Sequence, residues 1–150
     1  VYDKAALALF MLKDLLGEDV FFKGLKNFYQ GNLFRPARTA DFQRSLEKIS
    51  GLDLKQFFQD WFYSEVLPEV KIKKKITVKP DQIELELEVR QIKKPLFFPL
   101  KIVVETDRGS FVENLIVQNP EQVFHLEFPG KLKRLDINPG HQVPGKIEIN

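Results

Sequence analysis

The sequence predicts an α+β fold in which a helical part precedes an antiparallel β-sandwich. Up to about Leu67 the apolar residues recur at the helical spacing i, i+4, i+7, and from Glu69 onward they alternate with polar residues. Turn-forming Gly, Pro, Asn and Asp separate the alternating runs of the second half. Pro68 closes the helical part, so we expect the boundary between residues 1–67 and 68–150.

The first predicted helix covers about Asp3 to Leu16. Gly17 follows it and suits the left-handed conformation found after helix ends. The stretch from Ala5 to Leu12 is apolar on every side, and a helix of this kind is buried in a larger core.

Three further helices are predicted from spacing and capping signals. One runs from about Glu18 to Gln30, and the next follows Thr39, which can cap it. Asp53 with Gln56 resembles a capping box for the last one. Their apolar positions are Phe21, Leu25 and Phe28; Phe42, Leu46 and Ile49; and Leu54, Phe57, Phe58, Trp61 and Phe62.

About seven short strands are predicted in the second half, which suggests a small sandwich. The clearest strand alternates apolar residues with Glu84, Glu86, Glu88 and Arg90, so one of its faces is expected to be exposed to solvent. We expect Lys74 to interrupt the preceding strand. The strands are marked by Val70, Ile72, Ile76 and Val78; Ile83 to Arg90; Phe98–Thr106; Ser110–Val117; Gln122–Phe128; Leu132–Ile137; and Lys146–Ile149.

Composition excludes several classes of protein. The chain has 23 basic and 21 acidic residues, a balance that gives no electrostatic reason to expect nucleic-acid binding. It has no Cys, so disulfides and thiolate metal sites are excluded, and either redox compartment is compatible. The longest apolar run, Ala5 to Leu12, is far shorter than the roughly 20 residues of a membrane-spanning helix, so we expect no membrane segment.

No self-contained active site follows from residue patterns alone. His125 and His141 do not form an H-x-x-x-H pair, and neither a G-x-S-x-G nor a Gly-rich phosphate motif is present. The basic run Lys71, Lys73, Lys74 and Lys75 is interpreted as a solvated strand face that protects an edge, with an anionic partner as the alternative. The aromatic stripe around Trp61 is interpreted as core.

The order of motifs, however, resembles a known family. The stretches "VYDKAALALFMLKDLLGEDVFFKGLKNFYQ" and "TADFQRSLEKISGLDLKQFFQDWFY" are similar to the helices that follow the zinc site in the aminopeptidase N family of zinc metallopeptidases. This family belongs to the gluzincins, as do the leukotriene hydrolases. "LELEVRQIKKPLFFPLKIVVET" and "LKRLDINPG" resemble segments of the β-sandwich that comes next in the family.

The resemblance implies a function for one residue. In the V-Y-[DE]-K-G motif of the family the tyrosine is catalytic, and Tyr2 matches it. A phenol stays protonated at neutral pH and can donate a hydrogen bond to the oxyanion that forms opposite the zinc.

The resemblance also implies what this chain does not contain. The H-E-x-x-H helix, its distal Glu and the G-A-M-E-N loop lie upstream in the family. We therefore expect residues 1–67 to be the C-terminal helical part of a thermolysin-like catalytic domain, and 68–150 an immunoglobulin-like β-sandwich. Zinc and the peptide substrate are expected in a longer parent enzyme with the upstream domain as partner. We expect no metal ligands and no activity in this chain alone.

Two residues depart from the family pattern, and one of them, Ala5, keeps an alternative open. Ala5 stands where the family usually has Gly, and Leu67 where it often has Gly. The alternative is a catalytically inactive relative whose helices and sandwich serve as a protein-interaction scaffold.

Overall fold

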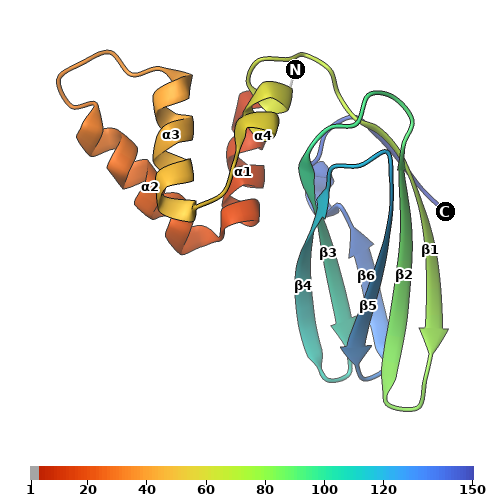
Figure 1. Cartoon of the computed structure of the whole chain (residues 1–150). Helices are drawn as coiled ribbons and strands as arrows, with labels where there is room; N and C mark the ends of the chain where they lie inside the picture. Colours follow the sequence, from red (N-terminus) through yellow and green to blue (C-terminus); the bar gives the residue numbers. More distant parts are fainter. Residues whose placement is uncertain (1–3) are drawn as a thin grey trace. The chain divides into compact units, whose positions relative to one another are not determined.

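A computed structural model describes residues 4–150, and it divides them into two compact units (Figure 1). One unit ends at Val66 and is helical. The other, Leu67–Asn150, consists of strands and one short 3-10 turn. The predicted α+β class is therefore confirmed.

The helical unit contains all four predicted helices. They are α1 Lys4–Leu16, α2 Glu18–Gly31, α3 Thr39–Ser50 and α4 Lys55–Trp61. The aromatic stripe of α4 is core, as predicted, because Phe57, Phe58 and Trp61 are almost fully buried. Phe62 is half-buried and stacks on Phe58 with ring centroids 4.7 Å apart.

Two predicted helix starts are wrong in detail. Thr39 is the first helical residue rather than the cap, and the Asp41 carboxylate accepts the Arg38 backbone N–H at 2.9 Å. At α4 the Asp53 carboxylate accepts the Lys55 N–H at 2.9 Å. Gln56 donates forward to Asp60 instead of closing a box.

Helix α1 is covered on one face in this chain. Ala8, Met11 and Leu12 are fully buried, whereas Leu9 and Phe10 are 40% and 57% exposed. Within the described residues, the complete burial expected for an all-apolar helix is therefore not reached.

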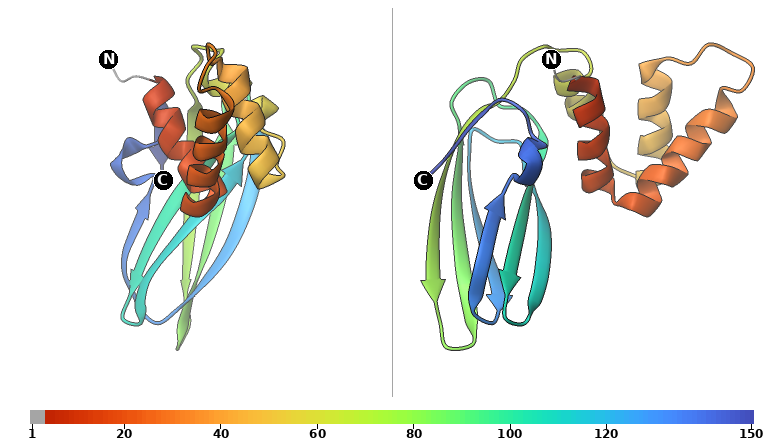
Figure 2. Two further views of the ribbon diagram at one scale, coloured as in Figure 1. Left: turned by 90° about the vertical axis from the view of Figure 1, so that its left-hand side faces the viewer. Right: turned by 180° about the vertical axis from the view of Figure 1, so that it is seen from behind.

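The second unit is a two-layer sandwich (Figures 1 and 2). One sheet has the order β5-β2-β1-β7 and the other β4-β3-β6. Their inward side chains, such as Leu85, Leu87, Phe98 and Leu100, form the core. The strands are β1 Glu69–Val78, β2 Gln82–Gln91, β3 Phe98–Thr106, β4 Gly109–Val117, β5 Glu121–Pro129, β6 Leu132–Ile137 and β7 Lys146–Ile149, with the turn η1 at Pro139–His141.

Strand β1 differs from its prediction. It is continuous through Lys74, so the predicted interruption is wrong. The lysine instead marks where the strand leaves the core, because Val70 and Ile72 are buried while Val78 is 73% exposed.

The edge of β1 explains its lysines. Strand β7 pairs with β1 in parallel and only as far as Ile72. Lys73 and Lys75 lie beyond that point, directly opposite Glu88 and Glu86 of β2. The neighbouring acids therefore offset the lysines, as predicted, and the parallel pairing of β7 is the departure from a purely antiparallel sandwich.

Candidate functional site

The predicted catalytic residue, Tyr2, lies outside the described residues. The part of its motif that the structure describes begins at Lys4, the first residue of α1. The candidate site is therefore built from Lys4 and what its side chain contacts.

The Lys4 ammonium binds the C-terminal end of α4 and the segment after it. Nζ donates to the carbonyl oxygens of Asp60 at 2.7 Å and Val66 at 2.9 Å, and also to that of Ser64. An ammonium carries three N–H donors, so these three carbonyls satisfy all of them. We call this arrangement the Lys4 clasp; Nζ also lies 5.1 Å from the centre of a Trp61 ring, within cation–π range.

Electrostatics explain why a cation is tolerated at this position. A positive charge in the first turn opposes the dipole of α1, but the same charge at the last carbonyls of α4 is favourable. Partial burial lowers the pKa of Lys4 from its usual value, and the carboxylates of Asp60 and Glu65 oppose that shift. With three carbonyl acceptors around it, Lys4 serves as a hydrogen-bonding clamp and is poorly suited to act as a base or nucleophile.

Sequence reasoning missed the role of Lys4. The signal was present, because a lysine in the first turn of an apolar helix is unfavourable unless something distant binds it. Its acceptors, 56 to 62 residues further along the chain, carry no motif, since they are backbone carbonyls.

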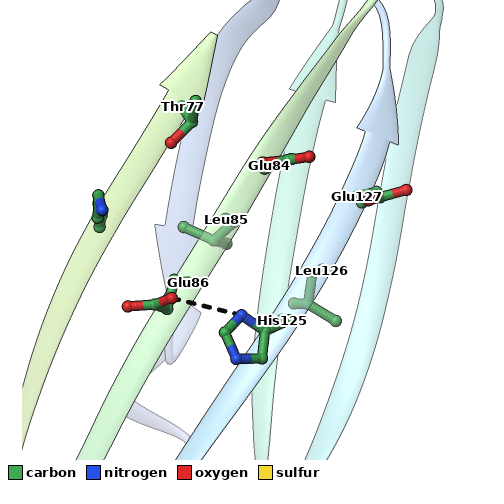
Figure 3. Close-up of a pocket in the computed structure, with 8 residues that line it drawn as sticks. Thr77, Glu84, Leu85, Glu86, His125, Leu126 and Glu127 are labelled. Carbon is green, nitrogen blue, oxygen red and sulfur yellow. Dashed lines mark ion pairs between the residues drawn. The ribbon is translucent and has the colours of Figure 1, made fainter. Parts of the chain in front are cut away.

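A second candidate is a hollow of about 280 Å³ on the outer face of β1, β2 and β5 (Figure 3). Glu84, Glu86, His125 and Glu127 line it together with Lys75. His125 Nδ1 lies 3.4 Å from Glu86 Oε2, with these side chains 71% and 37% exposed. Exposed pairs of this kind contribute little to stability, so the hollow is a solvated strand face with mixed charge.

The structure does not bring the two histidines into a metal site. His125 is on β5, while His141 ends the turn η1. Over residues 4–150, no cluster of three or more His, Asp or Glu could hold a metal ion. None of the helices in that range has the length and apolar character needed to span a bilayer.

Comparison with protein families matches residues 1–61 to the family described as "Peptidase family M1 domain". The match ends at Trp61, the last residue of α4, and includes the whole V-Y-D-K stretch.

Curated relatives are aminopeptidases. The chain is 28% identical over 119 residues to aminopeptidase N of Escherichia coli, covering 75% of this chain and 14% of that protein. It is 30% identical over 149 residues to glutamyl aminopeptidase of Rattus norvegicus, covering 93% of this chain and 15% of that protein. The chain thus spans about one seventh of the length of these relatives.

A solved structure shares the fold of the chain. Aminopeptidase A of Legionella pneumophila, crystallised in complex with aspartic acid, matches with a TM-score of 0.74 and 21% identity. The match covers 99% of this chain and 18% of that one, so this chain shares the fold of a segment of that protein.

Proposed function

Because this chain is a relative of the M1 aminopeptidases, we propose that it belongs to a zinc-dependent enzyme that removes N-terminal residues from peptides. The observation that carries the proposal is the family match over residues 1–61. The similarity of fold over nearly the whole chain supports it.

In this proposal the chain contributes Tyr2 to the reaction. The phenol hydroxyl donates a hydrogen bond to the negative oxygen of the tetrahedral intermediate formed when water attacks the peptide carbonyl. Tyr2 stands in "VYDK", inside the matched residues, at the position of the catalytic tyrosine in the family motif that this stretch resembles.

The zinc must then be held by other parts of the parent enzyme. A catalytic zinc takes three protein ligands, and the described residues offer no such cluster. These residues therefore do not fit a zinc ion, and we derive no catalytic step for this chain beyond hydrogen-bond donation by Tyr2.

The test is hydrolysis of aminoacyl p-nitroanilides by the full-length protein that carries this chain. We expect turnover that 1,10-phenanthroline abolishes and stoichiometric zinc restores. The isolated 150-residue chain is the control, and we expect it to be inactive and to hold far less than one zinc per molecule.

A folded full-length protein that releases no amino acid from any peptide, with or without added zinc, would contradict the proposal. That result would favour the inactive scaffold.

A further inference from the structure

We propose that Lys4 is a positioning residue for Tyr2: the Lys4 clasp fixes the first turn of α1 and thereby the place from which Tyr2 donates its hydrogen bond. The inference rests on the proposed function, since it assigns to Lys4 a part in the same catalytic step.

The first argument is the number and reach of the contacts. One Nζ atom holds the carbonyl oxygens of Asp60, Ser64 and Val66, from the end of α4 into the segment that follows it. Figure 1 shows α1 and α4 side by side within the helical unit. The clasp therefore ties the start of the first helix to residues at the far end of the same unit.

The second argument is that packing alone holds the first turn weakly. Lys4, Ala5 and Leu7 are half-buried and Ala6 is exposed, while full burial begins only at Ala8. Helix ends with few buried contacts open at low free-energy cost. The long-range hydrogen bonds of Lys4 therefore restrain the first turn of α1, where packing restrains it little.

The third argument is chain geometry. Tyr2 stands two residues before Lys4 in the sequence, and two residues of chain span at most about 7 Å, so Lys4 is the described residue best placed to act on Tyr2 through the backbone. Oxyanion stabilisation depends on a donor at about 2.7–3.1 Å from the developing charge, and a displacement of about 1 Å can cost a hundredfold in rate.

The experiment is a double-mutant cycle in the full-length enzyme, with Lys4→Met, Tyr2→Phe and the double variant. Methionine keeps most of the aliphatic stem but removes the charge and all three donors. We expect Lys4→Met to lower kcat by about tenfold to a hundredfold with KM nearly unchanged. In the Tyr2→Phe background the same substitution should change kcat less than about twofold, because the residue it positions is gone.

Lys13→Met is the matched control. Lys13 is on the same helix, and its Nζ lies 5.9 Å from the ring of Phe10, a contact within α1 that does not reach α4. We expect kcat to stay within about twofold of wild type, because the contact that this substitution removes lies within α1.

A conservative variant separates positioning from folding. Lys4→Arg keeps a cation near the carbonyls, and we expect it to recover part of the lost kcat. If Lys4→Met does not fold, as judged by circular dichroism, Lys4→Arg replaces it in the double-mutant cycle.

Two outcomes would overturn the inference, and a third would contradict the proposed function on which it rests. Lys4→Met could leave kcat unchanged, or it could lower kcat by the same factor with and without the Tyr2 hydroxyl, which indicates a merely structural role. Tyr2→Phe could itself leave kcat unchanged, and this result would instead contradict the catalytic role of Tyr2 in the proposed function.

Discussion

The helical unit and the sandwich each contain a polar side chain that makes three hydrogen bonds to the backbone, but the two side chains differ in chemistry. In the sandwich, buried Gln91 exchanges two hydrogen bonds of 2.9 Å with the backbone of Leu96, five residues away, and donates a third to the Asn119 carbonyl at 3.3 Å. In the helical unit, Lys4 is charged and reaches carbonyls 56 to 62 residues away. The neutral amide holds the loop at Leu96 and also reaches Asn119, 28 residues away, whereas the ammonium joins distant ends of one unit.

The two units also differ in what they leave exposed. Among the described residues, the exposed aromatic side chains all belong to the helical unit, and Phe34 is 98% exposed. The exposed large hydrophobics of the sandwich strands are aliphatic and β-branched. Within residues 4–150, the sandwich therefore leaves no large aromatic side chain exposed, whereas the helical unit leaves several exposed.

The largest effect on the free energy of unfolding should come from removing the side-chain amide of Gln91. Gln91→Leu leaves both the N–H and the carbonyl of Leu96 without their partner, and an unsatisfied buried group costs about 1–3 kcal/mol. We expect a loss of about 3 kcal/mol in urea unfolding of the sandwich, followed by far-UV circular dichroism. Gln118→Leu, at an exposed position, is the control, and an equal loss there would contradict the assignment.

A smaller loss of stability is expected from adding a methyl group at Gly24, where α2 packs against α3. A Cβ on Gly24 would lie 2.5 Å from Cδ2 of fully buried Leu46. Overpacking costs about 1–3 kcal/mol, and alanine's better helix propensity returns up to about 1 kcal/mol, so we expect Gly24→Ala to destabilise by about 1 kcal/mol.

The single tryptophan, Trp61, is in the helical unit, so its fluorescence measures this change separately from the sandwich. Gly31→Ala is the control, because a Cβ there meets nothing within 4 Å. Gly24→Ala proteins as stable as Gly31→Ala would show that α2 and α3 are not packed as described.

The smallest effect concerns pH. The Arg38 backbone N–H, and then the charges of Arg35 and Arg44, lower the pKa of Asp41 below its usual 3.8. A lowered carboxyl pKa adds stability that is present above pH 3.8 and is lost as the pH falls through the folded-state value.

Asp41→Asn should therefore destabilise the helical unit at pH 7 but not once the pH is well below 3.8. Tryptophan fluorescence during urea unfolding at both pH values measures the difference. A stability difference that persists unchanged at low pH would mean that the charge of Asp41 contributes nothing.

Local patterns predicted the fold better than they predicted the site. Sequence patterns placed β3, β6 and β7 at their observed bounds. In β3 the burial follows a period of two from Leu100 onward, whereas β6 and β7 do not alternate in this way, so their bounds were found from the turn residues that flank them. The start of α3 and the path of β1 were predicted less well. The start of α3 depends on the hydrogen bond from the Arg38 N–H to Asp41, and the path of β1 depends on its pairing with the short strand β7. The acceptors of the Lys4 clasp could not be predicted, because they are backbone carbonyls; the unfavourable position of a lysine in the first turn indicated only that some distant group binds it. Tyr2 was found through a motif, and its role remains a prediction.

The most direct test of the account is the kcat of the full-length enzyme with Tyr2→Phe, which removes one hydroxyl. Loss of a single oxyanion donor lowers kcat by about a hundredfold to a thousandfold in other enzymes, and we predict a loss in that range with KM little changed. A loss well under tenfold, in a protein that is folded and contains zinc, would contradict the catalytic role of Tyr2.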